Sequence, residues 1–270
     1  MDFAYVIWDV DPEIVNIFNF SIRWYGVLFA LAFLVSYYIF SKFFKQENIP
    51  IEKLDKLTFY VAIGTIIGAR LGHVCFYEPA YYCSNPSEII KIWHGGLASH
   101  GAAIGILLAL WIFSKHFEKS FLWLLDKIGI VVALSGSFIR IGNLMNSEIV
   151  GKPSNVPWAF AFVRDNFYKG LPENFTRHPT QLYEAIGYFL IFVILYYLNQ
   201  KKSSHKKEGY LFGVFLILLF GFRFFIEFFK DVQVSFEQSM ILNMGQILSI
   251  PFILFGFYLI YTKNLAKNKK

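Results

Sequence analysis

The chain has 270 residues, of which 56% are hydrophobic and only 16% charged, and its mean hydropathy is +0.47. A water-soluble domain needs about a quarter of its residues charged, so this composition excludes an ordinary soluble fold. The formal charge of +6 comes from short lysine clusters at the ends of apolar runs, not from one basic stripe, which argues against nucleic-acid binding. We therefore expect an all-α polytopic membrane protein.

The N-terminal residues 1–21 form an arm ahead of the first long apolar run. The arm is acidic and lacks the basic start and continuous apolar core of a cleavable signal peptide. Its apolar residues have a near-helical spacing: Phe3, Val6, Ile7, Val10, Ile14, Ile17 and Phe18. This spacing predicts a short amphipathic arm that lies on a membrane face.

Long apolar segments follow the arm through the rest of the chain. A hydrocarbon core of about 30 Å requires about 20 apolar residues per helix. About seven segments meet this requirement, at residues 22–44, 57–77, 95–113, 122–145, 180–198, 209–229 and 241–262. Residues 1–270 are accordingly expected to form one integral-membrane domain.

The distribution of lysines predicts the orientation of these segments. Lysine-rich stretches at 42–56, 115–119, 201–207 and 263–270 all fall on one side if there are seven spans. By the positive-inside rule the C-terminus is then cytoplasmic and the N-terminus outside, in the bacterial cytoplasmic (inner) membrane. The connection 146–179 becomes a small periplasmic lobe.

Ionisable residues within spans indicate where a functional site lies, because placing such a residue in the membrane costs several kcal/mol of free energy unless it is paired or hydrated. Neighbouring spans run in opposite directions, so position along a span gives depth. Nearly all the costly or polar candidates fall in the outer half of the membrane: Tyr25, Arg70, His100, Arg140, Asn143, His178, Arg223 and Glu227. A shared depth predicts a polar cavity that opens toward the outer leaflet.

Three arginines in such a cavity suit a lipid phosphate, because guanidinium offers forked donors and stays charged. A histidine can take a proton from a nucleophile near neutral pH. Structural alternatives remain: Arg223 and Glu227 are one helical turn apart and could simply neutralise each other. A lipid transporter or flippase with an outer-leaflet head-group site would also use intramembrane charge, as would a phospholipid receptor.

The chain also lacks the motifs of several other enzyme classes. Cys75 and Cys83 lack CxxC or zinc-type spacing, which supports neither a disulfide framework nor a metal site. There is no G-x-S-x-G elbow, HExxH helix or P-loop. Group transfer from a phospholipid is favoured over hydrolysis by those routes.

Five strings resemble, in chain order, the motifs of the prolipoprotein diacylglyceryl transferase family. They are SIRWYG (21–26), HGGLASHG (94–101), RIGNLMNSEIVGKP (140–153), RHPTQLYEA (177–185) and FRFFIEFFKD (222–231). MGQILSIP (244–251) is similar to the last span of that family. The resemblance implies transfer of a diacylglyceryl group from phosphatidylglycerol to the lipobox cysteine thiol of a preprolipoprotein signal peptide. It also implies release of glycerol 1-phosphate without a metal or cofactor.

The resemblance marks these functional positions: Tyr25, His100, Arg140, Asn143, Glu148, Gly151, Arg223 and Glu227. We expect His100, Arg140 and Arg223 to be catalytic, and Arg140 and the remaining positions to bind substrate. Arg70, Asn146 and His178 are added as substrate-binding candidates. The chain departs from the family pattern at Ser99, Ala102 and Lys230, the last where arginine is common.

Overall fold

The computed structural model describes residues 5–17, 20–201, 208–231 and 240–265. The lysine-rich segment 202–207 and the end of the C-terminal tail lie outside this range. Internal contacts divide the chain into two compact units. One unit comprises Met1–Ser36 with Asp126–Lys270, and the other comprises Tyr37–Leu125.

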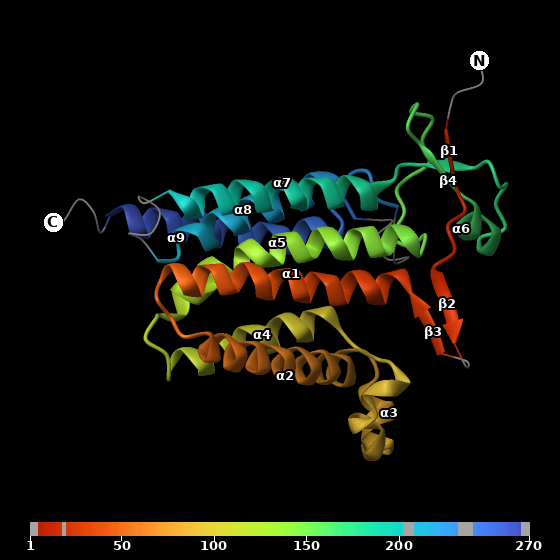
Figure 1. Ribbon diagram of the computed structural model, residues 1–270. Coiled ribbons are helices and arrows are strands. Elements are labelled where there is room, and N and C mark those ends of the chain that lie inside the picture. The colour runs from red at the N-terminus through yellow and green to blue at the C-terminus, as the bar shows by residue number, and fades with distance from the viewer. Residues whose placement is uncertain (1–4, 18–19, 202–207, 232–239, 266–270) are drawn as a thin grey trace. The chain divides into compact units, whose positions relative to one another are not determined.

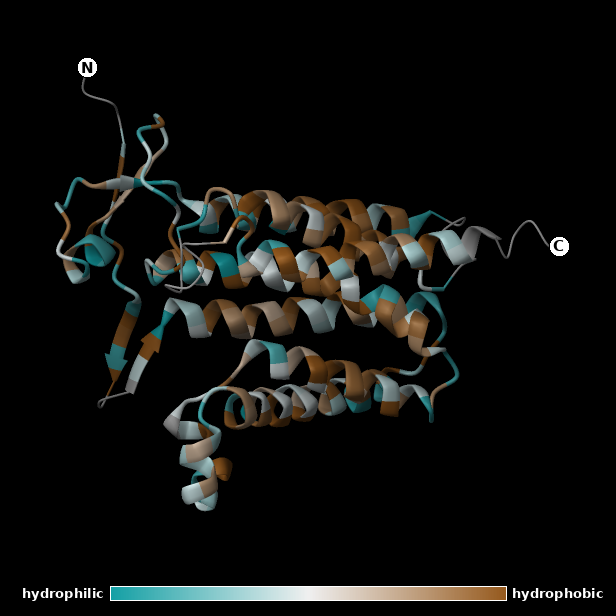
Figure 2. Cartoon of the chain, turned by 180° about the vertical axis from the view of Figure 1, so that it is seen from behind, coloured by the Kyte–Doolittle hydropathy of each residue, from teal (hydrophilic) through white to brown (hydrophobic). Residues whose placement is uncertain are grey.

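Within the described part of the chain, seven apolar helices occur in the predicted order, as the labels in Figure 1 allow the reader to follow. They are α1 (Trp24–Gln46), α2 (Ile51–Phe76), α4 (Ser99–Ser114), α5 (Phe121–Met145), α7 (Thr180–Gln200), α8 (Tyr210–Ile226) and α9 (Met244–Leu265). Among the described residues, five of them are long and apolar enough to cross a membrane, and α4 and α8 are shorter apolar helices. The hydrophobic colouring of these helices in Figure 2 matches that assignment. The chain is a polytopic membrane protein.

Two helix starts differ from the prediction for identifiable reasons. Helix α2 begins at Ile51, six residues before the predicted start at 57, directly after Pro50. A proline is compatible with the position before a helix because its missing N–H would have no partner there. Helix α4 begins at Ser99 instead of 95, because Gly95 and Gly96 adopt φ values of +86° and +73° that no right-handed helix contains.

The prediction of a helical N-terminal arm is wrong. The described part of the arm forms β1 (Val6–Trp8) and β2 (Glu13–Ile17), and β2 pairs in antiparallel fashion with β3 (Phe20–Arg23). Phe3 and Phe18 lie outside the described residues. The arm is rich in β-branched residues, which favour strands when a partner strand is present. That partner comes from far along the chain and cannot be read from local spacing.

The partner of β1 belongs to the segment predicted as a lobe, 146–179. Strand β1 pairs in parallel with β4 (Phe160–Phe162), which pairs in antiparallel fashion with β5 (Thr176–Arg177). A short helix, α6 (Val163–Tyr168), connects β4 toward β5. The small core beneath the sheet contains Leu144, Val150, Phe160 and Phe162.

The unit Tyr37–Leu125 is built on close packing of α2 against α4, which lie side by side in Figure 1. A Cβ atom added at Gly64 would lie 2.6 Å from the carbonyl oxygen of Gly105, and one at Gly72 would lie 2.7 Å from the Cα of Gly101. These distances leave no room for a side chain, so these glycines allow the two helix backbones to pack directly against each other. An apolar groove of about 620 Å³ runs along the two helices.

A buried carboxylate organises one end of the other unit. Asp126 Oδ2 accepts a hydrogen bond from the backbone N–H of Gly209, and Oδ1 accepts one from Phe212, both at 2.7 Å. These contacts satisfy free N–H groups at the start of α8, as an N-cap side chain would. Lys127 donates to Asn199 Oδ1 at 2.6 Å beside it. Asp126 and Lys127 therefore connect α5 to the start of α8 and to α7.

Candidate active site

The C-terminal end of α5 presents Arg140 and Asn143 one helical turn apart, so both project from one face. Arg140 Nη1 donates to Asn143 Oδ1 at 3.1 Å, and Asn143 Nδ2 donates to Glu148 Oε1 at 2.7 Å. Asn146 also donates to Glu148 Oε1, at 3.3 Å. The R-x-G-N-x-x-N-x-E string thus folds back on itself and forms one hydrogen-bonded chain.

The turn after α5 makes this return possible. Ser147 and Ile149 adopt positive φ values of 54° and 60°, which is rare for a non-glycine residue and an outlier for a β-branched one. The turn is held from α7: Gln181 donates to the Glu148 carbonyl at 2.7 Å, and Thr180 donates to the Ile149 carbonyl at 3.1 Å. Backbone strain of this kind persists only where surrounding contacts fix it.

Gly151 follows the turn and lies between two other segments. Its N–H donates to the His178 carbonyl at 3.0 Å on one side, and it forms an antiparallel bridge with Lys230 on the other. A Cβ at Gly151 would lie 2.6 Å from the His178 carbonyl oxygen and 2.8 Å from that of Phe229. Only glycine permits this approach of three backbone segments.

Lys230 brings two buried glutamates together. Its Nζ lies 3.0 Å from Glu184 Oε1, on α7, and 3.0 Å from Glu227 Oε1, at the end of α8. The other oxygen of Glu184 lies 3.0 Å from Arg140 Nε, and Tyr188 donates to Glu184 Oε1 at 3.1 Å. The relative exposures of the Lys230, Glu184 and Glu227 side chains are 5%, 0% and 9%.

Arg223 completes the network on the side of α8. Its Nε lies 3.7 Å from Glu227 Oε1 on the same helix, so the predicted pairing within one turn is present. Glu227 is not satisfied by Arg223 alone, however, because Lys230 and Asn243 also bind it, the latter at 3.0 Å through Nδ2. The Arg223 side chain is 38% exposed against 14% for Arg140. Arg223 is therefore the more accessible guanidinium of the two.

Tyr25, in the first turn of α1, packs against α5. A Cβ at Gly142 would lie 2.8 Å from the Tyr25 ring, so the small residue in the R-I-G-N string makes room for the tyrosine. The phenol lies close enough to Glu148 and Arg140 to interact with both charges. The first and third motif strings therefore meet in one unit.

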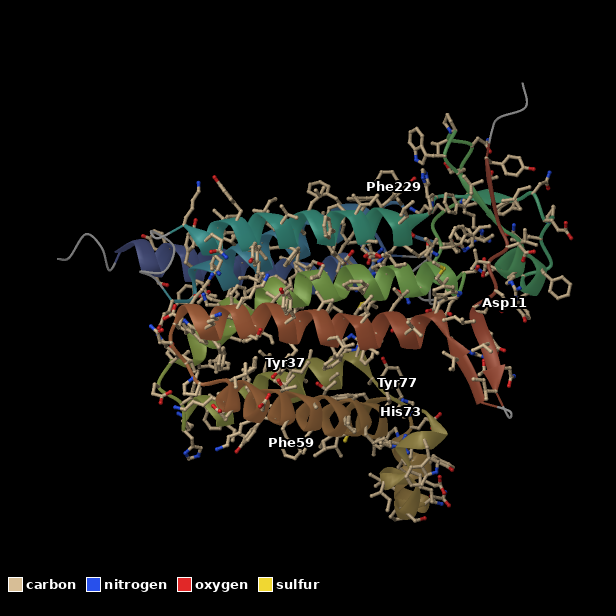
Figure 3. All side chains as sticks on the ribbon, in the orientation of Figure 1. Asp11, Tyr37, Phe59, His73, Tyr77 and Phe229 are labelled. Carbon is tan, nitrogen blue, oxygen red and sulfur yellow. The ribbon has the colours of Figure 1, made fainter. Side chains whose placement is uncertain are left out.

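His178 lies just before α7, beside the segment that contains Gly151. Its Nδ1 is 3.1 Å from the Tyr183 hydroxyl, which also accepts a hydrogen bond from Trp158 Nε1 at 2.8 Å. Its ring packs edge-on against Phe229, the residue labelled in Figure 3. Burial lowers the pKa of His178 below its usual value, which favours the neutral imidazole at neutral pH.

Arg70 belongs to the other unit and has a different environment. Its three guanidinium nitrogens all donate to backbone carbonyls of the loop that follows α3 (Pro79–Ser84) and precedes α4. The acceptors are the carbonyls of Glu88, Ile89, Lys91, Gly95 and Gly96. The Tyr82 ring lies 5.0 Å from the guanidinium carbon. Arg70 therefore shapes this loop, and its predicted role in substrate binding stays a prediction.

The histidine one turn further along α2 supports the same loop. His73 and Tyr77 are labelled in Figure 3, and their rings stack with centroids 5.5 Å apart. A Cβ at Gly96 would lie 2.6 Å from the His73 ring and 2.8 Å from Arg70 Nη1. The glycine pair ahead of α4 thus wraps directly around two α2 side chains.

Replacing Arg70 with lysine is expected to loosen the loop, because an ammonium has three donors for five carbonyls and cannot match their planar spread. Unpaired buried carbonyls cost about 1–3 kcal/mol each, so we expect faster tryptic cleavage at Lys91 in membrane vesicles. Arg164→Lys is the control, since Arg164 is a partly exposed partner of Asp9 and Asp11. Unchanged cleavage in Arg70→Lys would contradict the loop-shaping role.

His100 is the second residue of α4 and is exposed within its unit. Gly101 beside it is buried against α2, which fixes the backbone that carries the histidine. His100 and Arg70 lie in the unit Tyr37–Leu125, and the remaining candidates lie in the other unit. The meeting of His100 with the arginines in one chamber stays a prediction.

Three side chains that complete the network were not among the predicted site residues. Glu184 lies within the string RHPTQLYEA but was not singled out, Lys230 was noted only as a departure from the family pattern, and Asn243 was not noted. The spacing of Glu227 and Lys230, three residues apart at a helix end, could have indicated their ion pair. No local signal indicates Asn243.

The fold and the site together define a polytopic membrane protein with a partly buried cluster of arginines, a chemistry suited to a phosphorylated lipid. Comparison with known proteins is consistent with this class. The model of a protein family described as prolipoprotein diacylglyceryl transferase matches residues 12–262. The chain belongs to the prolipoprotein diacylglyceryl transferase family.

Relatives of nearly full length support that membership. The phosphatidylglycerol–prolipoprotein diacylglyceryl transferase of Tolumonas auensis is 47% identical, with 94% of this chain and 96% of the relative covered. The protein of the same name from Chloroherpeton thalassium is 46% identical over 96% of this chain and 94% of its own. The Porphyromonas gingivalis protein is 44% identical, with 95% and 94% covered.

Proposed function

We propose that this chain transfers the diacylglyceryl group of phosphatidylglycerol to the thiol of the lipobox cysteine in prolipoproteins. The observation that carries the proposal is the full-length similarity to transferases of this name, together with the paired arginines Arg140 and Arg223. Family membership favours this reaction over lipid transport. No metal or cofactor takes part in the reaction as proposed.

The reaction forms a C–S bond and breaks a C–O bond. The cysteine thiolate attacks the carbon of the diacylglyceryl unit that bears the phosphate. Glycerol 1-phosphate then leaves with the electron pair of the broken C–O bond. The thiol proton passes to His100, because the thiolate is the effective nucleophile and a free cysteine is mostly protonated at neutral pH. Arg140 and Arg223 stabilise the charge that grows on the departing phosphate.

The remaining candidates hold the substrate. Glu227 orients Arg223 across one helical turn, and Tyr25 and Asn143 hydrogen-bond the lipid head group beside Arg140. We assign Asn146, Glu148, Gly151 and His178 to substrate binding as well, since they lie in the same group of contacts. We further propose a location in the bacterial inner membrane with the N-terminus and the 146–179 lobe outside and the C-terminus cytoplasmic. The lipobox cysteine follows an apolar signal helix and would emerge at this outer face.

The test is the mass of a lipoprotein co-expressed with this chain in cells depleted of their own transferase. A gain of one diacylglyceryl group supports the proposal, whereas an unmodified lipoprotein in the presence of well-expressed chain would refute it. With His100→Gln we expect a loss of about 10²–10⁴-fold in transfer rate, because glutamine keeps the polarity but cannot take a proton. The control is His116→Gln, at an exposed position beyond α4. Full activity in His100→Gln would remove His100 from the mechanism.

A further inference from the structure

The two arginines of the site are joined through a single amine. Lys230 Nζ lies 3.0 Å from one carboxylate oxygen of Glu184 and 3.0 Å from one of Glu227. Glu184 in turn contacts Arg140 at 3.0 Å, and Glu227 contacts Arg223 at 3.7 Å. The order of contacts is therefore arginine, glutamate, lysine, glutamate, arginine, drawn from α5, α7, α8 and the residues just after α8.

The position of the amine is fixed from several directions. The Lys230 backbone forms a bridge with Gly151, which anchors the lysine to the strand after the α5 turn. Its partner Glu227 is held from the far side by Asn243 at 3.0 Å, and a Cβ at Gly245 would lie 2.5 Å from that carboxylate. The Lys230 side chain is 5% exposed, so water does little to screen these contacts.

The charges of these five groups do not cancel. Arg140, Arg223 and Lys230 supply three positive charges, and Glu184 and Glu227 supply two negative charges, so one positive charge remains. Glu148 adds a negative charge nearby, but it is exposed, and its Oε1 accepts hydrogen bonds from the neutral side-chain amides of Asn143 and Asn146. A phosphodiester carries a single negative charge, which matches the remaining positive one.

Resting on the function proposed above, we propose that Lys230 is a positioning residue for diacylglyceryl transfer. It holds Glu184 and Glu227 in place against Arg140 and Arg223, and it sets the surplus charge that receives the phosphodiester of phosphatidylglycerol. Without the amine, two carboxylates face two arginines, so the net charge of the group is zero and it no longer attracts an anionic lipid. The lysine contacts glutamates and not the substrate, so it acts through the arginines.

Four variants of the full chain test this in phosphatidylglycerol-containing nanodiscs with a fluorescent lipobox peptide. In Lys230→Met we expect kcat/KM to fall about 100-fold or more, with KM for phosphatidylglycerol raised, because the site loses the surplus positive charge that receives the phosphodiester and the amine that holds both glutamates. Lys230→Arg keeps the charge and should stay within about tenfold of the unchanged chain. Lys152→Met removes an exposed lysine from the paired strand and should have no effect.

The decisive variant is Lys230→Met combined with Glu184→Gln, which removes one positive and one negative charge and restores the surplus of one. If Lys230 sets the charge of the site, this double variant should recover at least about tenfold in kcat/KM over Lys230→Met, as expected for groups in one network. If Lys230 merely stabilises the fold, the double variant should show no such recovery in kcat/KM. The proposal is overturned if Lys230→Met stays within threefold of the unchanged chain, or if the double variant is no more active than Lys230→Met. Absence of transfer by the unchanged chain in the same nanodiscs would instead refute the proposed function.

Discussion

Replacing Arg140 with alanine is expected to reduce diacylglyceryl transfer by about 10²–10³-fold or more, the usual cost of removing a preorganised group that stabilises transition-state charge. The variant loses the contact with Glu184 at 3.0 Å and the hydrogen bond to Asn143. Glu184 is fully buried and keeps only its contacts with Lys230 and Tyr188, so the weaker compensation of its charge adds to the loss. Transfer to a lipobox peptide, measured at saturating phosphatidylglycerol, gives the effect on kcat.

Arg164→Ala is the matched control for that experiment. Arg164 also pairs with two carboxylates, those of Asp9 and Asp11, but both aspartates are well exposed and Arg164 is partly exposed. Exposed ion pairs contribute about 0–1 kcal/mol, so transfer should be nearly unchanged. Lysine at position 140 should not rescue activity, because a point charge cannot bind Asn143 and Glu184 with the same planar geometry. Activity of Arg140→Ala near that of the control would exclude Arg140 from the chemistry.

The second large effect is expected for Gly151→Ala. The added methyl group would lie within 3 Å of two carbonyl oxygens, those of His178 and Phe229, and backbone atoms cannot rotate away as a side chain can. Relief requires the strand to move from His178 or from Lys230, which disrupts the site from both sides. We expect a loss of about 1–3 kcal/mol in stability, as is usual for overpacking. Transfer activity should fall further still, since the bridge to Lys230 is part of the network.

Gly221→Ala provides the comparison, because nothing lies within 4 Å of the added Cβ on α8. Alanine there also has the higher helix propensity, so the control should be at least as stable as the unchanged chain. Thermal unfolding of the purified variants in detergent, followed by the transfer assay, separates the two effects. Equal melting temperature and activity for both alanine variants would show that Gly151 is not confined as described.

Hydropathy predicted the helices well because the bilayer imposes a length and an apolar composition that are visible in any single segment. The seven predicted segments each correspond to a helix, and α7 begins at Thr180 as predicted. The prediction for the N-terminal arm was wrong because its conformation is not determined by its own segment. Its conformation depends on β4, more than 150 residues away, and local spacing contains no information about that partner.

The candidate site was predictable in its residues but not in their connections. Arg140, Asn143 and Glu148 occur in one string, yet only the turn at Ser147 and Ile149 brings the carboxylate back to the amide. Arg70 shares its predicted depth with the other arginines, and depth alone cannot distinguish a guanidinium bound to carbonyls from one free for phosphate. At position 230 this chain has lysine where arginine is common in the family. The contacts there need a cation that reaches both Glu184 and Glu227, and lysine meets that need.

The contact between α2 and α4 limits how that unit can respond when lipid tails move past it. Helices usually slide by an ångström or two because their interface side chains change rotamer. At Gly64, Gly68, Gly101 and Gly105 the two backbones meet directly, so there are no rotamers to change. Helices α2 and α4 should therefore move as one rigid body. The apolar groove along them should keep a constant width while acyl chains exchange in it.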